Sequence, residues 1–194
     1  MKTWLIVGLG NHGATYARTW HNMGFIAVDM LADDLGLDWK KKPLANFKMA
    51  SGHLENSDKV ILLKPLTYMN RSGEAVLSII RKHKIESENL IVLVDDLYID
   101  KGKIRVGRGG GNGGHNGIRS INNLTGAKDY IKVKLGIKPD KEVHSLSNYV
   151  LARIGEEDRE YVEDSCANAV ECVKMLVSGE SIDKLQAKFN CKNS

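Results

Sequence analysis

A glycine-rich run between Gly107 and Gly117 is the feature that most limits how this chain can fold. Six of the nine residues from 109 to 117 are glycine, and the other three are Asn112, His115 and Asn116. Glycine loses more backbone entropy on folding than other residues, so a dense cluster needs a reason such as positive φ angles or close approach to a ligand. A flexible linker is the alternative, but the run lacks serine and leads directly into a helix-like segment at 118–124. We therefore expect a loop at a binding site, carrying an imidazole and amides.

Composition indicates a folded, water-soluble chain. Of its 194 residues 42% are hydrophobic, which suffices for a substantial core, and we expect one domain over 1–194. No apolar run approaches the roughly 20 residues that span a bilayer, and the apolar N-terminal strand is too short for a signal-peptide core. The three cysteines form no CxxC pair: Cys166, Cys172 and Cys191. This usage argues against a zinc site and predicts reduced thiols in the cytoplasm.

The net charge of +4 is modest, but its distribution along the chain is uneven. Acidic residues concentrate in 156–171. The basic residues form three clusters: Lys40, Lys41 and Lys42; Lys101, Lys103, Arg105 and Arg108; Lys132, Lys134, Lys138 and Lys141. Solvated surface lysines are the simple reading of any one cluster. Because two of the clusters flank the glycine run, the pattern favours contact with a polyanion there.

The periodicity of apolar residues alternates between strand and helix. Strands are predicted at 4–7, 46–55, 59–63, 90–94, 103–106 and 130–137, and helices at 15–35, 72–83, 116–124, 156–177 and 181–188. Within the first helix, Phe25, Val28, Met30 and Leu31 are the expected core positions. The polar segment 138–148 is expected to be a mobile loop near a site. Together these elements predict an α/β fold, a single-domain three-layer sandwich with a mixed, mostly parallel twisted sheet flanked by helices.

Residues 8–13 match the GxGxxG fingerprint of dinucleotide-binding proteins, after a strand and before a helix. That fingerprint should be completed by an acidic residue at the end of a second strand about 20 residues on. Here Asp29, Asp33 and Asp34 fall in the predicted helix instead. A dinucleotide-binding oxidoreductase is therefore only a minor alternative. The second glycine run is no Walker A motif either, since no Gly-Lys-Ser/Thr follows it.

Polar side chains recur where the predicted strands end, which is where α/β sheets build their sites. They are Asn11, the pair His21 and Asn22, the triplet 68–70, the pair Asp95 and Asp96, and the pair His115 and Asn116. No GxSxG nucleophile elbow is present and the cysteines lie far along the chain. What remains is a histidine held by an aspartate and activating water, with amides orienting a substrate. A His/Asp metal site is the alternative, but these residues lack a recognisable ligand spacing, and we expect no metal or cofactor.

Four motifs in the same order and spacing carry a resemblance over nearly the whole chain. They are 8–11 with Tyr16, Thr19 and 21–24; 64–73; 95–97; and 109–117. In these motifs the chain resembles the bacterial peptidyl-tRNA hydrolase family. The resemblance implies a monomeric α/β enzyme that needs no cofactor. It would cleave the ester between a peptide and the 3′ ribose of tRNA, recycling tRNA released when ribosomes stall or lose their peptide.

The resemblance also implies a role for individual residues. His21 would be the general base on water, Asp95 would stabilise its basic form, and Asn11 would help distinguish N-blocked peptidyl-tRNA from free aminoacyl-tRNA. Residues matching the family's tRNA and peptide contacts are Tyr16, Tyr68, Asn70 and Asn116, while Met69 and His115 would line the pocket. Structural roles are the alternative for two of them, since Tyr16 also suits a core and Asn70 a helix cap.

The chain departs from the family pattern at several positions. His12 replaces a proline, Trp20 an arginine and Val94 a histidine, and 98–100 replaces a turn containing Leu-Pro. None of these changes removes a proposed catalytic group. A basic residue that clamps the tRNA 5′ phosphate aligns with Gly107, which leaves Arg105 or Arg108, with Lys134, as candidate phosphate contacts. A non-catalytic RNA-binding relative is the second functional alternative, although His21 and Asp95 argue against it because a binder needs no histidine with a fixed tautomer.

Overall fold

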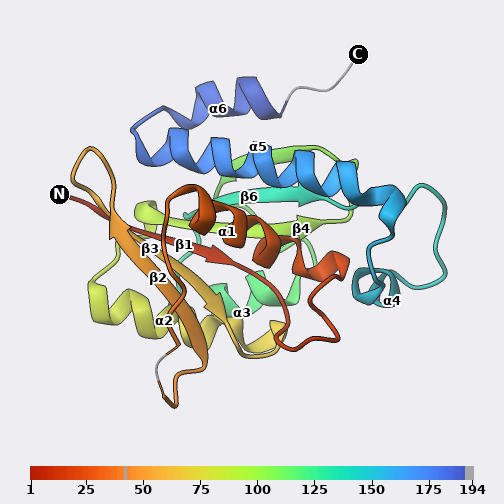
Figure 1. The fold of residues 1–194 in the computed structure, drawn as a ribbon, viewed down its shortest axis with the longest axis horizontal. Helices are drawn as coiled ribbons and strands as arrows, with labels where there is room; N and C mark the ends of the chain where they lie inside the picture. Colours follow the sequence, from red (N-terminus) through yellow and green to blue (C-terminus); the bar gives the residue numbers. More distant parts are fainter. Residues whose placement is uncertain (42, 191–194) are drawn as a thin grey trace.

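The computed structural model describes residues 1–41 and 43–190, so Lys42 of the first basic cluster and Cys191 lie outside it. Six strands form one sheet in the order β2-β3-β1-β4-β6-β5 (Figure 1). Their bounds are β1 Thr3–Gly8, β2 Phe47–His53, β3 Lys59–Pro65, β4 Leu90–Asp96, β5 Ile104–Arg108 and β6 Ile131–Gly136. All six predicted strands are thus present.

The sheet is parallel in its middle and antiparallel at both edges. β1 pairs in parallel with β3 and with β4, and β4 pairs in parallel with β6. The edge strands β2 and β5 pair antiparallel with β3 and β6. Residues 90–94 of β4 are buried, as a continuous apolar run in a sheet covered on both faces requires. The predicted mixed, mostly parallel sheet is confirmed.

Helices cover both faces of the sheet and form the two outer layers of the sandwich (Figure 1). The bounds are α1 Met23–Asp34, α2 Ser72–His83, α3 Asn116–Thr125, α4 Leu146–Leu151, α5 Arg159–Val177 and α6 Ile182–Phe189. One cluster of buried side chains packs under α1 and α5, and a second under α2 and α3. The predicted three-layer sandwich is therefore confirmed.

The first helix begins later than the sequence predicted. Residues 15–18 form turns and the helix starts at Met23 rather than near residue 15. The cause is a polar lock that periodicity does not reveal: the Asn22 side chain accepts the Asn11 N–H at 2.8 Å and donates to the Asn11 carbonyl at 3.0 Å. Phe25, Val28 and Leu31 are buried as expected, while Met30 is only partly buried.

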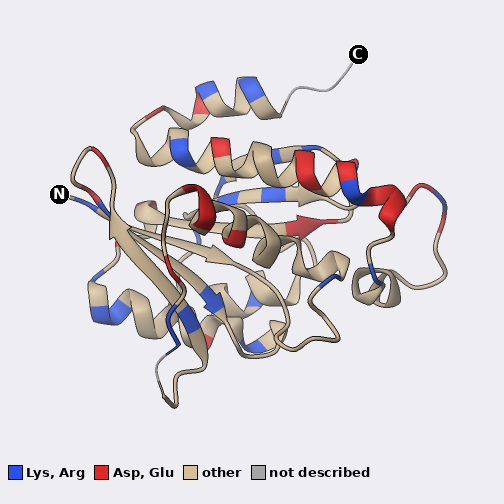
Figure 2. Ribbon diagram, viewed as in Figure 1, with Lys and Arg blue, Asp and Glu red and all other residues tan. Residues whose placement is uncertain are grey.

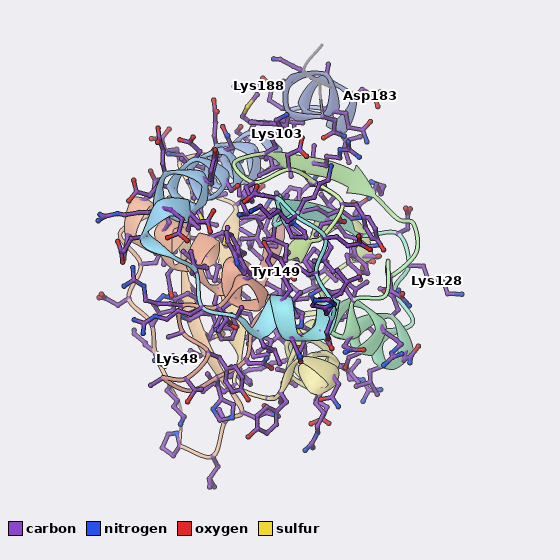
Figure 3. The ribbon with its side chains drawn as sticks, turned by 90° about the vertical axis from the view of Figure 1, so that its right-hand side faces the viewer. Lys48, Lys103, Lys128, Tyr149, Asp183 and Lys188 are labelled. Carbon is purple, nitrogen blue, oxygen red and sulfur yellow. The ribbon has the colours of Figure 1, made fainter. Side chains whose placement is uncertain are left out.

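The segment 138–148 is not the continuous loop that its polarity predicted, because it runs into α4. Ser145 caps this helix by accepting the Asn148 N–H. The helix is held against the short 3-10 helix Trp20–Asn22 by stacking of the Trp20 and Tyr149 rings, whose centroids lie 6.0 Å apart. Figure 3 looks onto α4 with Tyr149 labelled. The six residues of α4 include Ser147 and Asn148, and none of the six is buried, so the apolar pattern is too weak to predict a helix.

The close approach of α1 to the sheet depends on Gly24. A Cβ there would lie 2.4 Å from the Leu93 carbonyl oxygen and 2.5 Å from the Leu9 amide nitrogen. Because both neighbours are backbone atoms, they cannot move aside cheaply. We expect Gly24→Ala to lower the free energy of unfolding by about 1–3 kcal/mol. Denaturant titration measures this, with Gly111→Ala as the control: no atom lies within 4 Å of a Cβ at residue 111. Equal stabilities of the two variants would contradict the assignment.

Candidate active site

A groove of about 500 Å³ opens at the carboxyl ends of the central strands. β1 and β4 lie side by side there, with β2 and β3 on one side and β6 and β5 on the other. In open α/β sheets such a switch point leaves a crevice because the connections leave in opposite directions. The volume suits a ligand of moderate size.

Most of the predicted site residues line this groove. Those that do are Asn11, His21, Tyr68, Met69, Asn70, Asp95, His115, Asn116 and Lys134. Tyr16 is half-buried away from it, and Arg105 and Arg108 are exposed outside it. Lining residues that were not among the predicted site residues include Lys132, Leu146, Ser147, Val150 and Leu151. Four of these missed residues belong to the end of the polar segment or to α4. The capping serine at 145 was the signal available for them.

Asp95 lies buried between two histidines. Its carboxylate is 3.0 and 3.1 Å from Nδ1 of His21 and 3.0 Å from Nε2 of His115, while the two rings lie 4.9 Å apart. The three residues come from the end of β4, the turn before α1 and the end of the glycine loop. The sheet and the loop therefore bring together groups separated by 74 and 20 positions in the chain.

The chain around His115 determines which ring nitrogen carries its proton. Nδ1 of His115 accepts the Gly117 N–H at 3.1 Å and the Ile118 N–H at 3.4 Å, capping α3. A neutral ring that accepts at Nδ1 carries its hydrogen on Nε2, which then donates to Asp95. Burial acts to raise the pKa of Asp95, but the two histidines more than offset it, so the pKa lies well below its ordinary value. Asp95 is consequently an anion that accepts from both rings.

His21 completes this network from the other side. Its Nδ1 faces the Asp95 carboxylate and donates to it, which leaves Nε2 as the basic nitrogen. In the described residues Nε2 of His21 has no hydrogen-bond partner, and the side chain lines the groove. The arrangement is that of a general base held in one tautomer by a buried carboxylate.

The same three side chains are also the group that could hold a metal ion, because their ligand atoms all lie within 4.8 Å of one another. Metal binding would need a lone pair on Nε2 of His115. That nitrogen carries the proton, since the α3 cap occupies Nδ1. The geometry therefore favours a hydrogen-bonded network over a ligand set.

Two asparagines of the groove have amide NH₂ groups without a hydrogen-bond acceptor in the described part of the chain. Oδ1 of Asn11 accepts the Met69 N–H at 2.8 Å, and Oδ1 of Asn116 accepts from the Arg119 guanidinium at 2.8 Å. Because a backbone N–H and a guanidinium can only donate, the amide atom that faces each of them must be the oxygen and not the nitrogen. The remaining NH₂ groups suit carbonyl oxygens of a ligand.

The basic residues near the groove are used in different ways, which the linear clusters did not show. Lys134 pairs with Asp96 at 2.9 Å and stands opposite Arg105 in the β5–β6 ladder. Lys101 is enclosed by ion pairs to Asp140 and Asp158 and lies over the Trp20 ring. Figure 2 shows the acidic residues gathered along α5 and the basic stripe on β6.

Residues 5–194 match the sequence model of a protein family that is described as peptidyl-tRNA hydrolase. The chain belongs to the peptidyl-tRNA hydrolase family. Peptidyl-tRNA hydrolase of Lactococcus lactis subsp. cremoris is 38% identical over 97% of this chain and all of that protein. Its counterpart from Clostridium perfringens is also 38% identical, over 97% of this chain and 98% of that one.

Solved structures agree with the family assignment. Crystalline peptidyl-tRNA hydrolase from Acinetobacter baumannii has a TM-score of 0.89 and 34% identity, covering 98% of this chain and 96% of that one. The family resemblance and fold expected from the four motifs are thereby confirmed. The dinucleotide-binding alternative gains no support from these relatives. In the part of the chain that the structure describes, none of the helices combines the length and the hydrophobicity that spanning a bilayer requires.

Proposed function

We propose that this protein hydrolyses the ester between a peptide, or an N-blocked amino acid, and the 3′ ribose of tRNA. The observation that carries the proposal is the buried Asp95 carboxylate, which orients the open Nε2 of His21 toward the groove. Nε2 would take a proton from water as that water attacks the ester carbonyl. When the bond between the carbonyl carbon and the 3′ oxygen then breaks, Nε2 would return the proton to the leaving ribose oxygen, which releases the peptide acid and tRNA with a free 3′ hydroxyl. The NH₂ groups of Asn11 and Asn116 would donate to the carbonyl oxygen of the ester, which becomes negatively charged when water attacks the carbonyl carbon.

The remaining parts of the groove would hold the two ends of the substrate. Tyr68 is 57% exposed and its ring lies 5.4 Å from that of His12, so the pair offers stacking surface at the mouth. Tyr68, Asn70 and Asn116 would contact tRNA or peptide, while Met69 and His115 support the floor. The proposed contacts to the tRNA 5′ phosphate are Lys134 together with Arg105 or Arg108. Tyr16 is a proposed tRNA contact that lies outside the groove. We further propose that the protein acts as a cytoplasmic monomer.

The direct test is incubation of the protein with N-acetyl-aminoacyl-tRNA and with free aminoacyl-tRNA. We expect release of the N-acetyl amino acid and little release of the free one. A non-catalytic RNA-binding relative would bind tRNA but cleave neither, and that outcome would overturn the proposal.

Asn11 provides a sharper test of substrate choice. Its Oδ1 is committed to the Met69 N–H, so Asn11→Asp keeps this bond but replaces the free NH₂ with a carboxylate oxygen. We expect the preference for N-acetyl-aminoacyl-tRNA over free aminoacyl-tRNA, measured as the ratio of kcat/KM values, to fall about tenfold or more. A carboxylate attracts a free ammonium and repels carbonyl oxygen, and the loss of one such contact is worth about 1–3 kcal/mol. An unchanged ratio would exclude Asn11 from substrate discrimination.

A further inference from the structure

Lys132 of β6 is a lysine buried beneath the glycine loop. It is 3% exposed, and its ammonium donates to three consecutive carbonyls, those of Gly109 at 2.7 Å, Gly110 at 2.9 Å and Gly111 at 3.1 Å. Lysine is almost never buried this fully unless it is paired. No carboxylate among the described residues pairs with Lys132, and all three of its hydrogens go to the loop. Its role is thus to hold the loop backbone.

Besides Lys132, the start of the loop is held by the Gly109 N–H, which donates to the Tyr130 carbonyl at 3.0 Å. Gly110, Gly113 and Gly114 have φ angles of +80°, +56° and +78°, and no atom lies within 4 Å of a Cβ built on any of them. The Asn112 side chain and carbonyl close only the far end, at Gly114 and His115. Without the ammonium, three adjacent carbonyls in an open glycine segment would be free to turn.

The two sides of the loop backbone are used differently. The carbonyls of 109–111 are committed to Lys132. The N–H groups on the opposite sides of the same planar peptide units, those of Gly110, Gly111 and Asn112, have no hydrogen-bond partner within the described residues. Residues 111–114 line the groove together with Asn11, Met69 and the apolar side chains of α4. The loop therefore offers unpaired donors beside the His21–Asp95 site.

We propose that Lys132 is a positioning residue that turns the loop carbonyls inward and leaves its N–H groups to bind the backbone carbonyls of the peptide part of the substrate. The inference rests on the proposed function and assigns a recognition element within it. Recognition by backbone donors does not depend on the side chains of the peptide. It also explains why the segment is glycine, since side chains would cover the donors.

The test compares Lys132→Met with the unmutated protein on N-acetyl-triglycyl-tRNA and N-acetyl-glycyl-tRNA. Triglycine has no side chains, so it isolates backbone recognition. We expect KM for the triglycyl substrate to rise about tenfold while kcat changes less than about threefold, which is the signature of lost uniform binding. KM for the single-residue substrate should rise less. Lys188→Met, on α6 far from α4 in Figure 3, is the matched control and should change neither.

Three results would overturn the inference. The first is an unchanged KM for the triglycyl substrate in Lys132→Met. The second is a change in how tRNA affinity depends on salt. If the slope of log K against log[salt] is smaller in Lys132→Met by the amount expected for about one phosphate contact, Lys132 binds a phosphate of the tRNA. The third concerns the unmutated protein, so it does not depend on whether the variant folds. Millimolar N-acetyl-triglycine methyl ester should shift the NMR amide signals of Gly110, Gly111 and Asn112, and the absence of any shift would overturn the inference. Failure of the unmutated protein to cleave either substrate would instead refute the proposed function.

Discussion

Replacing His21 with alanine is expected to lower kcat on N-acetyl-aminoacyl-tRNA by about 10²–10⁴-fold, the usual contribution of a positioned general base. The variant removes the ring whose Nδ1 is held by Asp95 and whose Nε2 faces the groove. The remaining groove residues stay in place, so we expect the Kd for tRNA to change less than about threefold. Single-turnover cleavage and a filter-binding assay measure the two quantities separately.

His53→Ala is the matched control for this experiment. His53 is exposed on the edge strand β2, away from the groove, and its loss should leave kcat unchanged. Undiminished cleavage by His21→Ala would refute the assignment of the base. A parallel loss of tRNA binding would show that His21 acts in recognition instead.

Replacing Asp95 with asparagine is expected to be almost as damaging, with kcat lower by about 10³–10⁴-fold. His115 must donate from Nε2 because its Nδ1 caps α3, so the single amide oxygen of the introduced side chain would face His115. The amide NH₂ would then face Nδ1 of His21 and donate to it. His21 would carry its proton on Nε2, the nitrogen that has to accept one from water. The variant thus keeps the shape of the site but selects the wrong tautomer.

If Asp95→Asn loses activity because His21 is in the wrong tautomer, the fold and the tRNA affinity of the variant should be unchanged. Secondary structure by circular dichroism and tRNA affinity should both match the unmutated protein, because neither depends on the tautomer of His21. NMR of ¹⁵N-labelled imidazole should show the proton of His21 on Nε2 in the variant and on Nδ1 in the unmutated protein. Finding the proton on Nδ1 in both proteins would contradict the explanation.

The stability difference between these two proteins should depend on pH. The pKa of Asp95 is lowered in the folded state, so its ionised form stabilises the fold at pH values above the ordinary aspartate pKa of about 3.9. That contribution is lost as the pH falls from there through the folded-state pKa. The difference in unfolding free energy from Asp95→Asn should accordingly be constant near neutral pH and shrink below about pH 4. Urea titrations at several pH values measure it.

Much of the fold followed from local patterns. The apolar run 90–94 predicted a buried strand, and the residues after it place Asp95 at the carboxyl end of β4. The late start of α1 did not follow, because the Asn11–Asn22 lock joins residues on either side of a turn. α4 was also missed, since Tyr149 stacks on Trp20 across more than a hundred residues of chain and leaves no periodic signal.

The sequence by itself determined the α/β class, the glycine loop, and the pair His21 and Asp95 as the candidate base and its support. These depend on residue type and on motifs whose members lie close together in the chain. Only the tertiary structure decided that His115 shares Asp95, that its proton is on Nε2, and that Lys132 lies beneath the loop instead of on a polyanion-binding surface. The physical reason is that protonation and burial depend on neighbours across strands and loops. A linear list of histidines and lysines does not contain those neighbours.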